Sequence, residues 1–227
     1  MHSRVAMPRV VGRVLVAAAV VGGLMLAPPP ALGYHNVAPG LYWTAHPGSG
    51  YTYHIPACLH PNYDGGPPWR LWRNMHARAN DALHAWDDIG GELYFNRTDT
   101  SCQSLYNNGI PYVQIGWSPN LGTELIAWCQ NIWVWGPIPG EEQRAAVWLD
   151  MQDQALFWWG DGPAPAGKSD AAAVLAHELG HTLVLLHSDH PDDTMFDPLP
   201  QGSVSYSYRT PTYHDEQGYA YHYGWTH

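Results

Sequence analysis

Two histidines and a glutamate stand in an order and at a spacing that could hold a metal ion and use it. The segment His177-Glu178-Leu179-Gly180-His181 places the two histidines four residues apart. In a helix, that spacing puts both imidazole rings on one face, one turn apart. Two such nitrogens can ligate one Zn²⁺ at about 2.0–2.1 Å, as a tetrahedral site requires. Glu178 lies about 100° further round the helix, where it could accept a proton from an activated water. The segment therefore predicts a zinc site with a general base.

The residues that follow extend this pattern into a longer motif. His187 comes ten residues after His177, and Met195 comes eight residues after His187. The whole segment reads HELGHTLVLLHSDHPDDTMFDP. It resembles the metzincin clan of zinc peptidases, and within it the matrixins, whose motif HExxHxxGxxH is followed by a methionine-containing turn, the Met-turn. The resemblance covers about residues 42–224. It implies that His177, His181 and His187 ligate zinc, that Glu178 is the base, and that Met195 packs beneath the metal.

One position departs from the matrixin motif. The family has a glycine three residues after the second histidine, and this chain has Val184. A glycine there lets the chain leave the helix sharply, through a backbone region that a β-branched residue enters only with strain. If the helix continued, His187 would rise about 9 Å beyond His181 and point elsewhere. Either Val184 accepts a strain of about 1–3 kcal/mol, or the helix breaks one residue away. Otherwise Asp189 or His190 replaces His187 as the third ligand. We favour His187, because the Met-turn spacing is counted from it.

Periodic patterns on either side of the motif predict the elements that position it. Apolar residues recur at three- and four-residue steps over 69–89, which predicts a long helix. A second helix is predicted over 171–183, capped by Ser169 or Asp170, and a third over 212–223. Short runs between turn residues predict strands at 51–55 (closed by Pro56), 93–96, 112–117, 132–135 and 145–151. This order predicts an α/β or α+β layer fold with the motif helix packed on the sheet.

The matrixin resemblance makes the expected fold and substrate more specific. It implies an α+β domain with a twisted, mostly parallel sheet, an antiparallel edge strand, two long helices, the Met-turn and a C-terminal helix. It identifies 145–150 with the edge strand of the family. A protein or peptide substrate would then lie extended along Val147 to Met151 by strand addition. Phe196 to Tyr208 would wall the pocket on the primed side of the scissile bond, where Tyr206 or Tyr208 could reach the oxyanion.

The first 33 residues predict export from the cell. Three arginines precede an unbroken apolar run at 14–27, and three prolines and the small-x-small sequence 31–33 follow it. This pattern is typical of a signal peptide cleaved before Tyr34, leaving a single mature domain at 34–227. The run is shorter than the roughly 20 apolar residues of a membrane span, so we predict no stable membrane anchor. Too few residues separate Tyr34 from the first strand for the cysteine-containing prodomain that keeps many matrixins latent.

Charge bears on the partners of the protein. The 227 residues carry a formal net charge of −10 at pH 7. Signal cleavage would remove the positive charges of Arg4, Arg9 and Arg13, which takes that net charge to −13. A surface this acidic repels phosphate backbones and anionic lipids, so we predict no nucleic-acid partner. The sequence gives no prediction of the oligomeric state.

Cysteines and carboxylates suggest two further features. Export permits a disulfide among Cys58, Cys102 and Cys129. We expect Cys102 to pair with Cys129, because they flank one turn-rich stretch, although either could pair with Cys58. Matrixins often bind Ca²⁺, for which the nearby carboxylates are Asp189, Asp192, Asp193 and Asp197. They have no EF-hand arrangement, so a solvated acidic loop is the stronger expectation.

The sequence thus favours a secreted zinc-dependent endopeptidase in which Glu178 is the general base of a metal-activated water. One alternative is a non-catalytic secreted zinc protein, whose 12 Trp and 14 Tyr would bind a glycan or another protein. Glu178 argues against that alternative, because a structural zinc needs no base. The other alternative is a metal hydrolase that acts on cell-wall peptides, and the motif does not separate it from a protease.

Overall fold

The computed structural model describes residues 42–43, 53–60, 69–89, 93–118, 121, 126–133, 141–150 and 153–223. The predicted signal peptide 1–33 and its cleavage site before Tyr34 lie outside these residues. In the described part of the chain, no helix has both the length and the apolar character needed to cross a membrane.

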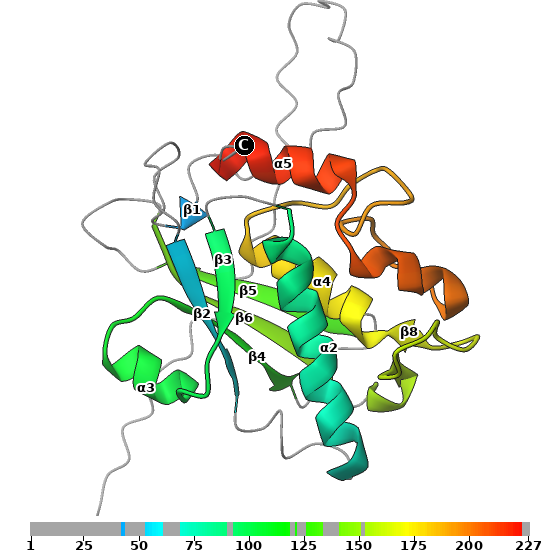
Figure 1. Ribbon diagram of the computed structural model, residues 1–227, viewed down its shortest axis with the longest axis horizontal. Helices are drawn as coiled ribbons and strands as arrows, with labels where there is room; N and C mark the ends of the chain where they lie inside the picture. The colour runs from blue at the N-terminus through cyan, green and yellow to red at the C-terminus, as the bar shows by residue number, and fades with distance from the viewer. Residues whose placement is uncertain are drawn as a thin grey trace, which may run out of the picture. The chain divides into compact units, whose positions relative to one another are not determined.

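A six-stranded sheet lies at the centre of the described structure (Figure 1). Its strands are β1 (Tyr42–Trp43), β2 (Tyr53–Leu59), β3 (Leu93–Arg97), β4 (Tyr112–Ser118), β5 (Ala127–Trp133) and β6 (Glu141–Asp150). They are ordered β1-β6-β4-β2-β3, and β5 pairs with β6. The β5–β6 pairing is antiparallel, whereas the others in this sheet are parallel. This mostly parallel sheet together with helices confirms the predicted α+β class.

Helices α2 and α4 lie side by side against one face of this sheet (Figure 1). The described α-helices are α2 (Trp69–Asp87), α3 (Cys102–Asn107), α4 (Ala171–Thr182) and α5 (Tyr213–Tyr223). The short elements are the 3₁₀ helices η1 (Gln154–Leu156) and η2 (Gly202–Arg209), and the paired strands β7 (Phe157–Trp158) and β8 (Ser169–Asp170). Three of the α-helices agree with the predicted ones to within two residues at each end. Helix α3 was not predicted.

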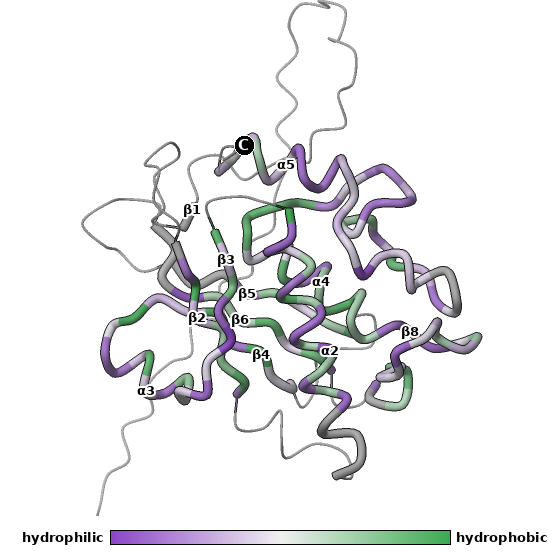
Figure 2. Tube along the Cα trace, viewed as in Figure 1, coloured by the Kyte–Doolittle hydropathy of each residue, from purple (hydrophilic) through white to green (hydrophobic). Residues whose placement is uncertain are grey.

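The hydrophobic core lies between the sheet and the helices α2 and α4. Alternate residues of the strands face it, among them Ile55, Val113 and Val147, each fully buried. Trp86 of α2 is buried in the same core, and its indole Nε1 donates to the carbonyl of Ala176 at 2.8 Å. Figure 2 shows hydrophobic residues along the central strands and α4, and hydrophilic residues along much of α5. The core therefore holds α4 in place from the sheet side and from α2.

The predicted edge strand is an interior strand. β6 pairs with β4 over Arg144–Asp150 and with β5 over Glu142–Leu149, so Val147 to Leu149 have neighbours on both sides. Ala145 to Val147 and Leu149 are fully buried, as is typical of a central strand covered on both faces. Among the described strands β5 pairs with β6 alone, and it is therefore the antiparallel edge strand on this side. Met151 lies outside the described residues.

Strand β2 also differs from its prediction, because it continues through Pro56 to Leu59. β3 pairs with it over Tyr53–Ala57, and β4 pairs with it only from Ala57 onward. Pro56 therefore stands where β2 has a neighbour on one side only. A missing N–H is tolerated at such a position, so the proline does not end the strand.

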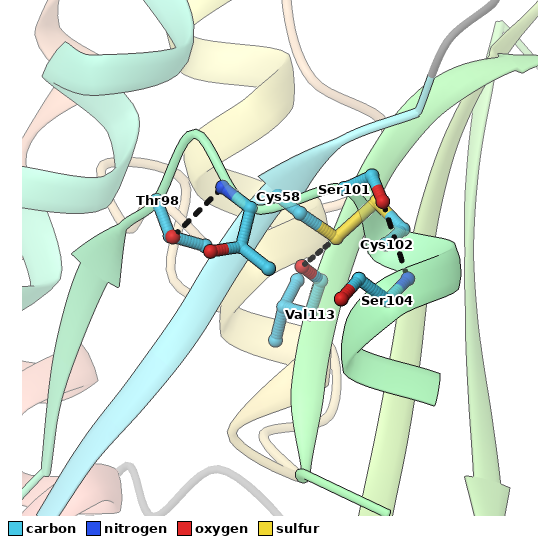
Figure 3. The surroundings of a disulfide bond; sticks show 7 residues. Cys58, Thr98, Ser101, Cys102, Ser104 and Val113 are labelled. Atoms are coloured by element: carbon cyan, nitrogen blue, oxygen red, sulfur yellow. Dashed lines mark hydrogen bonds between the residues drawn. A yellow bond between two sulfur atoms is a disulfide. The ribbon is translucent and has the colours of Figure 1, made fainter. Parts of the chain in front are cut away.

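The disulfide joins Cys58 to Cys102, and the predicted Cys102–Cys129 pair is wrong (Figure 3). Cys58 faces away from the main core, because its neighbours along β2 face into it. On that outer face it meets the first residue of α3, and Leu105 and Tyr112 complete a small second core. Cys129 lies on β5, which β6 and β4 separate from β2. No pattern in the sequence indicated a helix at 102–107, and Cys102 is the first residue of that helix.

Candidate metal centre

Helix α4 carries His177, Glu178 and His181, and the rest of the described structure surrounds it. Asp170 caps its N-terminus: its Oδ1 accepts from the backbone N–H groups of Ala172 at 3.0 Å and Ala173 at 3.2 Å. Of the two predicted caps, Asp170 is therefore the one that forms. Every residue of α4 is buried except His181, which is partly exposed. A helix buried all round cannot rotate to present another face, so the orientation of its histidines is fixed.

The chain leaves α4 through Val184, which adopts the left-handed backbone conformation with φ 68°. The backbone N–H of Leu185 donates to the Gly180 carbonyl at 3.1 Å, and that of Val184 to the His181 carbonyl at 3.0 Å. These two bonds form a Schellman motif, the usual end of a helix that turns sharply. Of the three outcomes that the sequence left open, the structure shows the first. Val184 is 4% exposed, so the packing of its side chain offsets the backbone strain.

This turn brings His187 back to the two histidines of α4. Nε2 of His187 lies 3.1 Å from Nε2 of His181. The ring centroid of His177 lies 4.8 Å from that of His181 and 5.2 Å from that of His187. One ligand atom from each residue lies within 4.8 Å of the others, which makes the three histidines close enough to bind a metal.

The other candidate ligands do not join this group, although Oδ2 of Asp197 lies 3.2 Å from Nδ1 of His187. Within the described ranges, no second set of three histidine, cysteine or carboxylate ligands comes this close together. His190 stacks instead on the ring of His214, with centroids 4.1 Å apart. Asp193, one of the candidates for Ca²⁺, is engaged by its own segment and by the start of α5: it accepts from Ser188 Oγ and from Thr212 Oγ1, and its Oδ1 lies 3.3 Å from Nδ1 of His214. The acidic loop therefore does not gather its carboxylates around one point.

The outer ring nitrogen, Nδ1, fixes the tautomer of each of the two α4 histidines. Nδ1 of His177 lies 2.8 Å from the Thr194 carbonyl oxygen, and Nδ1 of His181 lies 2.7 Å from that of Leu185. A carbonyl oxygen only accepts, so each Nδ1 carries the hydrogen and each Nε2 keeps its lone pair. Burial lowers the pKa of His177 to about 4 and that of His181 to about 3. Both rings are therefore neutral at pH 7, the form that ligates a metal.

Met195 packs beneath the site, and Asp215 fixes the backbone of the turn that carries Met195. Met195 is fully buried, as predicted, and lies directly beneath Gly180: a Cβ at that glycine would stand 2.2 Å from the Met195 Sδ. Asp215, at the start of α5 and also fully buried, accepts from the backbone N–H groups of Thr194 at 2.8 Å and Met195 at 3.2 Å. The Thr194 carbonyl in turn accepts from His177, so α5 reaches the centre through one peptide unit. The sequence pattern at 212–215 indicated a helix start and gave no sign of this second role.

Glu178 lies between the helix and the edge strand. Its side chain is buried, and burial first, then the charge of Asp197, raises the pKa of Glu178 to about 8. A hydrogen bond from the backbone N–H of Cys129 acts in the opposite direction. That bond places the carboxyl group against β5, the strand that replaces β6 as the sheet edge beside the site.

The two tyrosines that could have reached an oxyanion have other contacts. The Tyr208 hydroxyl donates to the backbone carbonyl of Pro191. The Tyr206 ring lies 4.5 Å below the guanidinium carbon of Arg209 and is 43% exposed. Neither contact points to the three histidines, so the structure gives neither tyrosine a part in the site.

No protein-family model and no curated protein sequence matches this chain. The chemistry of the site therefore has to be argued from its own residues. Three imidazoles converge beside a buried carboxyl group at a sheet edge, an arrangement that can hold a transition metal and move a proton next to it.

Proposed function

We propose that this chain is a secreted zinc-dependent endopeptidase of the matrixin type. The observation that carries the proposal is the convergence of His177, His181 and His187 beside Glu178. Val184 stands where the matrixin motif has a glycine, which left the role of His187 open. The left-handed turn at Val184 supports His187 as the third ligand. Export through the signal peptide 1–33 is part of the same proposal.

The donor set fits zinc. Three imidazole nitrogens leave a fourth tetrahedral position open, as catalytic zinc sites do and closed structural sites do not. Two of the rings have their outer nitrogens bonded to backbone carbonyls, which aims their lone pairs at the centre. When bound there, Zn²⁺ would supply Lewis acidity, which polarises a peptide carbonyl and lowers the pKa of water.

Glu178 is the proton carrier in this proposal. Its carboxylate accepts a proton from the attacking water and then delivers it to the leaving amine. Burial favours the protonated form, which suits a group that must give the proton back. A positive charge at the three histidines favours the carboxylate that has to accept the proton. Burial and the positive charge therefore act on Glu178 in opposite directions, which makes both of its protonation states accessible near neutral pH.

The substrate would bind along β5. Among the described strands β5 has β6 on one side alone, so its other side can accept an extended peptide by strand addition. The contact of Cys129 with Glu178 puts the carboxyl group next to this strand. This position replaces Val147 to Met151, where the sequence had placed the substrate.

The test is hydrolysis by the chain without residues 1–33. We expect about one zinc per chain, and cleavage of casein or gelatin that stops on addition of a chelator and returns with zinc. Glu178→Gln should keep the zinc and lower the rate by about 10²–10⁴. A zinc-loaded wild-type chain that cleaves neither protein but releases fragments from cell-wall peptides would favour the hydrolase alternative. Zinc without any hydrolysis would favour the non-catalytic one.

A further inference from the structure

His187 differs from His177 and His181 in the group that its outer ring nitrogen, Nδ1, contacts. Nδ1 of His177 and of His181 bonds a backbone carbonyl, whereas Nδ1 of His187 lies 3.2 Å from Oδ2 of Asp197. Asp197 is the one carboxylate among these three partners. A charged acceptor makes a stronger hydrogen bond than a carbonyl and makes the ring a more basic ligand.

His187 also has the least support from packing. Its side chain is 49% exposed, whereas His177 is 5% exposed and lies within α4. An exposed ring on a loop has more than one rotamer open to it, and only some of them aim Nε2 at the centre. Ordering this ring requires a bond, because the core does not surround it.

The backbone fastens together the two segments that carry these partners. Ser188 and Phe196 form a parallel bridge, and the backbone N–H of Ser188 donates to the Met195 carbonyl at 2.8 Å. His187 precedes one end of this bridge and Asp197 follows the other. The pair therefore does not depend on two flexible side chains meeting by chance: the segments that carry them are already fastened together.

We propose that Asp197 is a positioning residue of the metal centre, which holds Nδ1–H of His187 and aims Nε2 of that ring at the zinc. The inference rests on the zinc centre of the proposed function, but it does not require that the chain cleaves peptides. Its consequence is that one exposed carboxylate sets how tightly, and for how long, the third ligand retains the ion.

The experiment measures zinc binding by the chain without residues 1–33, by competition with a chromophoric chelator, and zinc release into excess chelator. Asp197→Ala removes the acceptor and the charge. Asp197→Asn keeps an oxygen that can accept from Nδ1 but removes the charge. Asp192→Asn is the matched control, because it removes the same charge from an exposed position on the same loop.

We expect Asp197→Ala to raise the zinc dissociation constant by about 10- to 100-fold and to speed release, as loss of an outer partner does in other zinc sites. Asp197→Asn should fall between Asp197→Ala and the wild type, and Asp192→Asn should match the wild type. The cobalt-substituted Asp197→Ala chain should have a changed visible spectrum, because the geometry of the third ligand is no longer fixed.

Equal zinc affinity in Asp197→Ala and Asp192→Asn would overturn the inference, whether or not the protein is a peptidase. A wild-type chain that binds zinc through Asp197 and cleaves nothing would leave the inference standing and remove the proposed function. Failure of the wild-type chain to bind zinc would overturn both. Unfolding curves of the metal-free variants identify any change that comes from the fold, and Asp197, being 53% exposed, should leave these curves unchanged.

Discussion

Val184 stands in a backbone conformation that its own side chain disfavours. A β-branched residue with φ 68° is a strained residue, and the left-handed region costs residues with a Cβ about 1–2 kcal/mol relative to glycine. Leu183 and Leu185 on either side are 1% exposed, and the Tyr223 hydroxyl lies 3.4 Å from the Leu183 carbonyl oxygen. The burial of this turn keeps the strained residue in place.

The strain can be measured by comparing two truncations of Val184. Val184→Ala loses buried methyl groups but keeps a Cβ, whereas Val184→Gly loses one more carbon and also relieves the strain. We expect Val184→Gly to be the more stable of the two by about 1 kcal/mol in urea unfolding, after the entropy that glycine adds to the unfolded chain is subtracted. At a buried site without strain the order is reversed, so a more stable Val184→Ala would show that the turn has another geometry.

The third ligand gives a second test with single residues. His187→Ala should weaken zinc binding by more than about 100-fold, because loss of an outer partner alone costs about 10–100-fold. His190→Ala is the matched control: its ring stacks on His214, away from the three histidines, and zinc affinity should not change. Equilibrium dialysis against a zinc buffer checks both. An equal loss in the two variants would move the third ligand away from His187.

At the scale of elements, an ion pair fastens η2 to the start of α4. Arg209 Nε lies 2.9 Å and 3.0 Å from the two carboxylate oxygens of Asp170, which is fully buried. The same guanidinium donates to the carbonyls of Gly160 at 2.8 Å and Asp161 at 3.1 Å. The loop before α4, the helix cap and η2 therefore share one cation.

Removal of that cation leaves the Asp170 carboxylate buried without a counter-charge, bonded to the backbone N–H groups of Ala172 and Ala173. We expect Arg209→Met to lower the free energy of unfolding by about 3–5 kcal/mol. The double variant with Asp170→Asn should recover a large part of this loss, because asparagine still caps α4 and carries no charge. Urea unfolding of the three proteins measures the effect. A loss below about 1 kcal/mol in the single variant would mean that water reaches the carboxylate and that the pair adds little.

Local patterns predicted the elements near the site better than the pairing between elements. The apolar period of α2 and the capping signals of α4 and α5 depend on neighbours in the sequence, and these helices form close to where they were expected. The position of β6 depends on which strands lie beside it, and its residues alone did not show that β5 would be the edge. The same limit applies to Cys102, whose partner depends on a short helix with a weak local signal.

The residues of the site also divide into those that the sequence predicted and those that it did not. His177, Glu178 and His181 could be predicted because one helix fixes their relative positions. His187 depended on a turn whose left-handed residue is not a glycine, so the motif alone left it open. Asp215 and the bond of Asp197 to His187 could not be found from spacing. They join segments that only the fold brings together.

At the scale of the whole molecule, the disulfide is the covalent link between distant parts of the described chain. It joins positions 44 residues apart and ties α3 to the outer face of the sheet. A loop of this length corresponds to about 4 kcal/mol in the chain-entropy account of disulfide stabilisation. The candidate metal centre lies on the other side of the sheet, next to β5.

Cysteine replacements distinguish the observed pair from the predicted one. Under oxidising conditions, Cys58→Ser should lower the free energy of unfolding by about 2–5 kcal/mol, and Cys102→Ser should do the same. Cys129→Ala should leave most of the stability in place, and this variant should show no free thiol after unfolding. Thermal unfolding with a thiol titration checks all three. A loss in Cys129→Ala as large as that in Cys102→Ser would restore the pairing expected from the sequence.

The contacts of α5 determine at what stage of synthesis the site can be assembled. Asp215 holds the backbone of Thr194 and Met195, and Tyr223 contacts the end of α4. The histidines of α4 leave the ribosome before either residue does. A growing chain that ends ahead of α5 would carry all three ligands and the general base without the contacts that arrange them. In the proposed peptidase the centre would therefore be completed late in synthesis, and a nascent chain would have no assembled site with which to cleave its surroundings.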